Sequence, residues 1–235
     1  QAAMIDGSTD DADRDRNMGY IVTGVSFGLV GGPIIGGVLA DPDILGSLAS
    51  FTLPCYAAFA MDVYGKGKRG TTVEENQALM NPLVGDRAEL QKRLAGGLAA
   101  AKQQVGVDPT KAAAIGFCFG GLAVLDMARA NHEVLGVASF HGLFRPAENV
   151  PAPKITAKVM IEHGWHDPMA TPEDVMAITK ELDGSGADWQ LHVHGNSMHS
   201  FTTLGADNKE MGTVYNADSD RRSFENLENF LSELF

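Results

Sequence analysis

Cysteine is scarce in this sequence, which has two thiols, Cys55 and Cys118, in 235 residues. Two cysteines do not form the disulfide framework of a small secreted scaffold, and their scarcity favours a reducing compartment. Basic residues are also few, because 18 Lys and Arg stand against 30 Asp and Glu and leave a net charge of −12. Such a surface repels nucleic-acid phosphates and anionic lipid headgroups, so we expect neither nucleic acid nor a membrane as a partner.

Charged side chains are absent from residues 17–40, a run long enough to cross a membrane. The run contains seven glycines and one proline, however, and the segment before it, residues 6–16, is mostly acidic. A signal peptide has a basic start and a compact apolar stretch instead. We therefore expect a strand followed by a glycine-rich loop inside a folded domain, and a cytoplasmic location.

Internal repeats, low-complexity tracts and linkers are also absent, which predicts a single domain over residues 1–235, with the order of residues 1–17 left open. Short apolar runs alternate with longer helical patterns, as in parallel strands joined by crossover helices. The predicted strands are residues 20–25, 57–63, 112–117, 134–140, 158–163 and 189–194. The predicted helices are residues 86–105, 118–131, 172–182 and 217–235. This rhythm predicts an α/β fold, a doubly wound and mostly parallel sheet with helices on both faces.

A nucleophile is indicated by Gly116-Phe-Cys-Phe-Gly-Gly121, which follows a predicted strand and precedes a predicted helix. This is the Gly-x-nucleophile-x-Gly elbow of the α/β-hydrolase fold, with Cys118 where most such proteins have serine. The turn places the sulfur at a helix N-terminus, which favours the thiolate, and makes the Phe119 N–H an oxyanion donor. The alternative is a structural thiol in a phosphate-binding turn, but no Lys-Ser/Thr pair follows the glycines as a Walker loop requires.

An acid and a base are expected after the nucleophile, in that order. Asp167 follows the strand at 158–163, so it lies at the edge of the sheet where ligands bind, and it can orient a histidine. Its alternative role is to cap the next helix. Glu162 is a weaker candidate, because within the strand it points towards a helix layer.

His199 is the predicted base, because it lies in a loop just after the last predicted strand. His192 and His194 alternate within that strand and face the same side, as metal ligands can. No third ligand with suitable spacing accompanies them, so we expect no metal.

Four segments resemble signature regions of the dienelactone hydrolase family, and the resemblance extends from about Ala57 to the C-terminus. The segments are Gly116-Phe-Cys-Phe-Gly-Gly121, Ser139-Phe-His-Gly142, His163-Gly-Trp-His-Asp-Pro168 and Met198-His-Ser-Phe201, and the tail from Val214 to Phe224 adds to them. The resemblance implies an α/β-hydrolase fold and a Cys118–His199–Asp167 triad that hydrolyses a small-molecule ester or lactone. It implies no cofactor, and we expect a monomer or a small homo-oligomer.

Two departures from the family pattern concern control of the thiol and the choice of substrate. Relatives carry His-Glu before a Phe-Gly-Leu-like sequence, and that glutamate controls the resting thiol; here Gly24 and Val25 occupy these positions. The second oxyanion donor is then predicted near Ser26, at Phe27. No arginine follows His199 to hold a substrate carboxylate, which favours a general esterase over a true dienelactonase. The substitutes considered are Lys66, Lys68, Arg69 and Arg87.

Two other functions remain open from the sequence alone. A catalytically impaired binding protein with the same fold agrees with the altered N-terminal third. A redox role for Cys118 is disfavoured, because no resolving Cys-x-x-Cys accompanies it.

Overall fold

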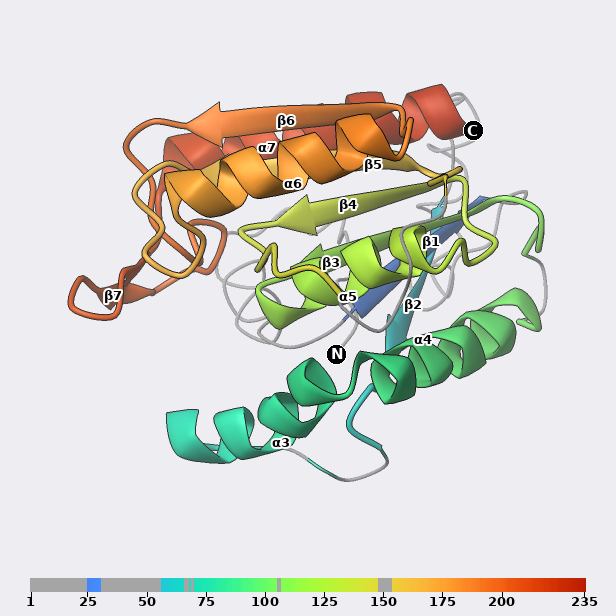
Figure 1. Cartoon of the computed structure of the whole chain (residues 1–235), viewed down its shortest axis with the longest axis horizontal. Coiled ribbons are helices and arrows are strands. Elements are labelled where there is room, and N and C mark those ends of the chain that lie inside the picture. The colour runs from blue at the N-terminus through green and yellow to red at the C-terminus, as the bar shows by residue number, and fades with distance from the viewer. Residues whose placement is uncertain (1–24, 31–55, 66–67, 69, 105–106, 148–153) are drawn as a thin grey trace, which may run out of the picture.

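The computed structural model describes residues 25–30, 56–65, 68, 70–104, 107–147 and 154–235, with the backbone alone for residues 25–30 (Figure 1). The first strands are β1 (Val25–Val30) and β2 (Tyr56–Met61), followed by the helices α3 (Val73–Gly85) and α4 (Arg87–Lys102). The chain continues through β3 (Ala112–Phe117), α5 (Phe119–Arg129), β4 (Gly136–Phe140), β5 (Lys158–Gly164), α6 (Pro172–Gly184) and β6 (Trp189–His194). It ends with β7 (Asp207–Asn208), β8 (Thr213–Val214) and α7 (Ala217–Leu234).

The six-stranded sheet has the order β2-β1-β3-β4-β5-β6. Strands β3 to β6 are parallel to their neighbours, whereas β1 is antiparallel to both β2 and β3. The parallel strands are almost continuously apolar and buried, as expected when helices cover both faces. The prediction of an α/β fold with a mostly parallel sheet is confirmed.

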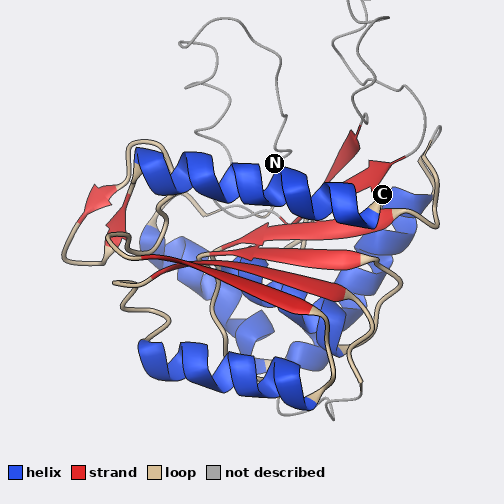
Figure 2. Ribbon diagram, turned by 90° about the horizontal axis from the view of Figure 1, so that it is seen from above, coloured by secondary structure: helices blue, strands red, loops and turns tan. Residues whose placement is uncertain are grey.

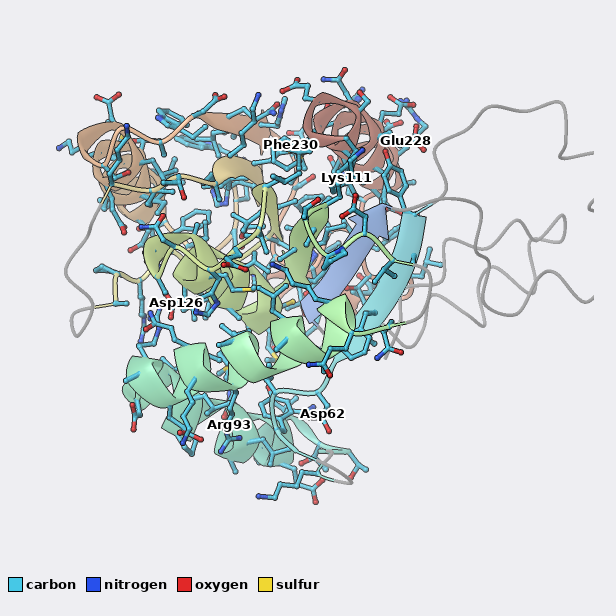
Figure 3. All side chains as sticks on the ribbon, turned by 90° about the vertical axis from the view of Figure 1, so that its right-hand side faces the viewer. Asp62, Arg93, Lys111, Asp126, Glu228 and Phe230 are labelled. Carbon is cyan, nitrogen blue, oxygen red and sulfur yellow. The ribbon has the colours of Figure 1, made fainter. Side chains whose placement is uncertain are left out.

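Helices pack on both faces of this sheet and form three layers (Figure 2). One apolar core joins the sheet to α3, α4, α5 and α6, with Leu90, Leu122 and Ile178 among its buried residues. A second core lies under α7, where Phe230 packs with Phe140 of β4 and Met160 of β5. Figure 3 shows Phe230 on α7 and Asp126 in the helical layer on the other face of the sheet.

Most predicted elements agree with the structure, but the N-terminal strand does not. Residues 20–24 lie outside the described residues, and β1 begins at Val25 and includes Phe27 and Gly28, which were assigned to a loop. The glycine-rich run has no clear alternation, so its sequence pattern does not locate the strand. Helix α3 was not predicted at all; it contains Pro82, a residue that normally argues against a helix interior.

The functional edge of the sheet is defined by the carboxyl ends of its parallel strands. Chain segments that leave β3, β4, β5 and β6 meet there, and each of them supplies a polar residue: Cys118, His141, Asp167 and His199. Ligands of open α/β sheets bind at this edge. Among the described helices, none is long and apolar enough to cross a membrane.

Candidate active site

Cys118 occupies the sharp turn between β3 and α5. Its backbone has φ 52° and ψ −117°, a conformation that non-glycine residues rarely adopt, and it forms the N-cap of α5. The Cys118 N–H donates to the Phe140 carbonyl of β4 at 3.1 Å, which holds the turn against the neighbouring strand. Cys118 as a residue is partly exposed, so the predicted elbow lies at the border between the core and the surface.

The elbow glycines are required because strand and helix approach closely. A Cβ atom added at Gly116 would lie 1.9 Å from the Gly120 carbonyl oxygen, and one added at Gly121 would lie 2.6 Å from Ser139 Oγ. The contact at Gly116 is with the backbone of α5, so it is relieved only by moving the helix away from the strand. The spacing of these glycines therefore reflects packing around the nucleophile.

We expect Gly116→Ala to lower the free energy of unfolding by about 3 kcal/mol and to reduce any activity of Cys118, since overpacking displaces α5. Gly96→Ala is the matched control, because a Cβ there meets no atom within 4 Å. That exposed helix position should gain about 0.5–1 kcal/mol. Urea unfolding followed by circular dichroism measures both, and equal effects of the two variants would contradict the packing argument.

His199 and Asp167 are hydrogen-bonded, although 31 residues separate them in the chain. The distance from His199 Nδ1 to Asp167 Oδ2 is 2.8 Å, and both side chains are buried. Asp167 is held in its turn by its own backbone N–H, which donates to Gly164, and its Oδ1 accepts from the Met169 N–H at 2.8 Å. The carboxylate thus fixes the ring of His199 and leaves Nε2 free to face the sulfur.

The charges of Cys118 and His199 stabilise each other. Burial alone would raise the pKa of the Cys118 thiol, but the positive charges and hydrogen bonds of His141 and His199 lower that pKa well below its usual value. Burial would lower the pKa of His199, but its hydrogen bonds with Asp167 and Cys118 raise that pKa to about 10. The favoured state is a thiolate beside an imidazolium, which is the reactive form of a nucleophilic cysteine.

His141 is a site residue to which the sequence analysis gave no role. Its Nδ1 lies 3.4 Å from Cys118 Sγ, and its Nε2 lies 2.8 Å from Thr202 Oγ1. The ring is fully buried, and its edge faces the ring of His199 with 5.2 Å between centroids. Its position in the sequence could have indicated this role, because His141 directly follows β4, and β4 lies beside β3, the strand that precedes Cys118.

Ser200 is a second residue that sequence reasoning missed, and its Oγ lies 3.6 Å from Cys118 Sγ. Its φ is 58°, and His141 has a φ of 35°, so both share the left-handed backbone conformation of Cys118. Among the described non-glycine residues, Asn131 alone joins these three in having a positive φ. In the part of the chain that the structure describes, backbone strain at non-glycine residues is therefore concentrated around the sulfur.

The predicted oxyanion donors have different positions. Phe119 is the first residue of α5, where a backbone N–H has no acceptor in its own helix, and its ring stacks on Tyr64. Phe27 lies within β1, where its Cα pairs with those of Phe59 and Ala114. That register places Phe27 inside the sheet, away from the edge that carries Cys118. The existence of a second oxyanion donor besides the Phe119 N–H stays a prediction.

Two other candidates have structural partners. Glu162 is fully buried and accepts from His194 Nε2 at 2.7 Å and from Asn226 Nδ2 of α7 at 3.0 Å, which agrees with its assignment to a helix layer. Arg87 was considered for a substrate carboxylate, and this was wrong: its guanidinium is buried in an ion pair with Asp126. Lys66 and Arg69 lie outside the described residues.

Asp220, in the first turn of α7, is a buried carboxyl near the site. Burial raises its pKa to about 6, against the hydrogen bond from the Tyr215 hydroxyl, and Oδ1 has no hydrogen-bond partner. In the unfolded chain the carboxyl ionises near its ordinary pKa of about 4. Folding therefore disfavours ionisation of Asp220. The free energy of unfolding falls for this reason as the pH rises through the unfolded-state pKa of about 4 and the folded-state pKa of about 6.

We expect Asp220→Asn to unfold at higher urea concentration than the wild type at pH 7.5, by about 1–2 kcal/mol in free energy. The amide oxygen still accepts from Tyr215, and no charge is buried. The gain should disappear near pH 4, where the wild-type carboxyl is protonated in the folded state. A gain of the same size at pH 4 and pH 7.5 would show that ionisation is not its cause.

The chain is similar to several known proteins. The model of the dienelactone hydrolase family matches residues 35–235. The uncharacterized protein K02A2.1 of Caenorhabditis elegans is 34% identical over 157 residues, which cover 65% of this chain and 99% of that protein.

Two solved structures resemble the chain in fold and in sequence. The structure m3DLH is 33% identical with a TM-score of 0.71, over 77% of this chain and 75% of that one. The crystal structure of P91, a dienelactone hydrolase-like promiscuous phosphotriesterase from metagenomic libraries, is 34% identical with a TM-score of 0.70, over 77% and 75% of the two chains. A putative dienelactone hydrolase from Klebsiella pneumoniae, 18% identical with a TM-score of 0.56, shares the fold.

Proposed function

The chain belongs to the dienelactone hydrolase family, and from this we propose that it hydrolyses carboxylic esters or lactones through a covalent intermediate on Cys118. The observation that carries the proposal is the position of His199, which hydrogen-bonds to Asp167 and faces the Cys118 sulfur. A nucleophile, a base and a group that orients the base define covalent acyl transfer.

Each step of the reaction has a residue to perform it. The Cys118 thiolate attacks the carbonyl carbon, and the developing oxyanion accepts a hydrogen bond from the Phe119 N–H. The tetrahedral intermediate collapses to a thioester, and the His199 imidazolium gives its proton to the leaving alkoxide. His199 then takes a proton from water, whose oxygen attacks the thioester and releases the acid and the Cys118 thiolate. Asp167 keeps the Nδ1–H of His199 in place throughout.

The resting thiolate has a different partner from the one the family pattern provides. Val25, which stands where the family has its controlling glutamate, begins β1 and pairs with Gly116, two residues before the nucleophile. His141 Nδ1 is the group 3.4 Å from the sulfur, and it carries no negative charge that would retain a proton on the thiol. We infer that the thiolate is present before substrate binds.

Uncharged activated esters are the proposed substrates, in preference to a carboxylate-bearing dienelactone. Arg87, the candidate buried within the described structure, already neutralises Asp126 and is not available to a second carboxylate. The segment after His199 offers hydroxyl groups, among them Ser200 and Thr202, in place of an arginine.

Hydrolysis of p-nitrophenyl acetate and butyrate tests the proposal, with wild type, Cys118→Ala, His199→Ala and the control His192→Ala. His192 is a partly exposed histidine of β6 that contacts Gln190, outside the site. We expect kcat/KM to fall by about a thousandfold or more in the two site variants, with an unchanged circular dichroism spectrum, and to stay within twofold in the control. No turnover by folded wild type would instead favour the binding-protein alternative.

Phosphotriester hydrolysis is a second candidate activity, favoured by the similarity to P91. The same thiolate can attack phosphorus in place of carbon, with release of the aryloxide. A dialkyl p-nitrophenyl phosphate tests it with the same variants. Turnover that survives Cys118→Ala would assign that activity to another group.

A further inference from the structure

Three side chains around the sulfur have the chemistry of a metal site as well as that of a triad. The sulfur of Cys118 and one ring nitrogen each of His141 and His199 all lie within 4.8 Å of one another. The residues come from three separate segments, after β3, β4 and β6, so the sheet itself brings them together. Thiolate and imidazole together are the ligand set that Zn²⁺ and other thiophilic divalent cations prefer.

The hydrogen bonds behind the two histidines resemble the outer shell of a metal site. His141 contacts Thr202 Oγ1 through Nε2 at 2.8 Å, which leaves Nδ1 for the centre. His199 contacts Asp167 through Nδ1 at 2.8 Å, which leaves Nε2. Metal-ligating histidines almost always use their second nitrogen in this way, and a carboxylate is a common partner.

Distance and exposure also suit a cation. In a tetrahedral zinc site a ligating sulfur and nitrogen are about 3.6 Å apart, given bonds of about 2.3 and 2.05 Å. Cys118 Sγ and His141 Nδ1 are 3.4 Å apart without any change in the fold. Both histidines are buried, whereas Cys118 is partly exposed, so the cluster borders the surface on the cysteine side, and a water from solvent would complete four-fold coordination of a cation.

We propose that Cys118, His141 and His199 bind a thiophilic divalent cation, Zn²⁺ above all, and that this binding reversibly inhibits the protein. Sulfur and both nitrogens donate their lone pairs to the cation, and the hydrogens that bridge them leave to the solvent. The sulfur then has no free pair for a carbonyl carbon, and His199 can no longer carry a proton. The inhibition rests on the proposed hydrolase function, but the binding does not.

Titration of the purified protein with Co²⁺ tests the site without any substrate. A tetrahedral cobalt–thiolate centre has a charge-transfer band in the near ultraviolet and intense visible bands. We expect one Co²⁺ per chain and displacement of these bands by Zn²⁺. The chain offers a matched pair of variants, because the bands should persist in Cys55→Ser and disappear in Cys118→Ser.

Two further variants test whether Co²⁺ binds through the histidines of the site and not elsewhere on the protein. Thr202→Val removes the partner of His141 with little change in shape, and we expect Co²⁺ affinity to fall about tenfold or more. His192→Ala should leave the affinity unchanged. A normal circular dichroism spectrum for Thr202→Val ensures that a loss of affinity reports on the site and not on unfolding.

The outcomes distinguish this proposal from the preceding one. Bands that depend on Cys118 support the metal site even in a preparation without esterase activity. Absence of the bands in wild type, or their persistence in Cys118→Ser, overturns the site. For the inhibition, p-nitrophenyl acetate hydrolysis should stop at one bound Zn²⁺ per chain and return on addition of EDTA; turnover that continues with the site occupied overturns it.

Discussion

Asp167→Asn is expected to lower kcat for p-nitrophenyl esters by about a thousandfold while the protein stays folded. The amide nearly matches the carboxylate in shape, but it removes the negative charge beside the His199 imidazolium and can favour the wrong tautomer of its ring. The raised pKa of His199 depends in part on this hydrogen bond, so the thiolate–imidazolium pair is weakened as well. Steady-state kinetics of wild type and Asp167→Asn measure kcat, and circular dichroism shows whether the variant is folded.

Glu162→Gln is the matched control for Asp167→Asn, because Glu162 is a buried carboxylate within β5, the strand that precedes Asp167. It contacts His194 and Asn226 and not His199. Its substitution should lower stability, since buried hydrogen bonds are altered, yet leave kcat of the folded protein within about tenfold. If Glu162→Gln abolished turnover and Asp167→Asn did not, the acid would have been assigned to the wrong residue.

Asp126→Ala is expected to destabilise the fold by about 3–5 kcal/mol, the second large effect. Asp126, labelled in Figure 3, is completely buried on α5. It binds Arg87 of α4 and Arg129 of its own helix. Arg129 in turn reaches Glu181 of α6 at 2.6 Å. Removal of the carboxylate leaves Arg87 as a buried cation without its ion-pair partner, which is far more costly than loss of a surface pair.

Urea unfolding at pH 7.5 measures the change, with Glu89→Ala as the control. Glu89 pairs with Arg93 at 2.8 Å on the exposed face of α4, where 37% and 38% of the two side chains are accessible. An exposed pair of this kind contributes about 1 kcal/mol or less. If the two variants unfolded at the same urea concentration, the buried network would not hold α4 and α6 against α5, the helix that begins at Cys118.

Sequence order and local chemistry were sufficient to predict Cys118, Asp167 and His199. Cys118 lies in a motif whose glycines are dictated by close packing, and Asp167 and His199 each follow a strand that is easily recognised by its apolar run. The structure brings these three to one edge of the sheet. That result required only the rule that the carboxyl ends of parallel strands meet.

Contacts that depend on side-chain direction could not be predicted in this way. His141 lies in Ser139-Phe-His-Gly142, one of the segments that resemble the family, but only its turn after β4 directs Nδ1 at the sulfur. Arg87 was considered for a substrate because sequence does not reveal that Asp126 lies one helix away. The register of β1 was missed because a run of glycines and apolar residues fits many alignments equally well.

The left-handed backbone at Cys118, His141 and Ser200 sets a limit on how this protein can be improved. Glycine would relieve the backbone strain at these positions, because it adopts a positive φ without a steric penalty. The same replacement at any of the three would remove an atom that touches the sulfur or the sulfur itself. Selection for thermal stability and selection for turnover therefore oppose each other at these positions. Stabilising changes that preserve activity are expected elsewhere, as at Gly96.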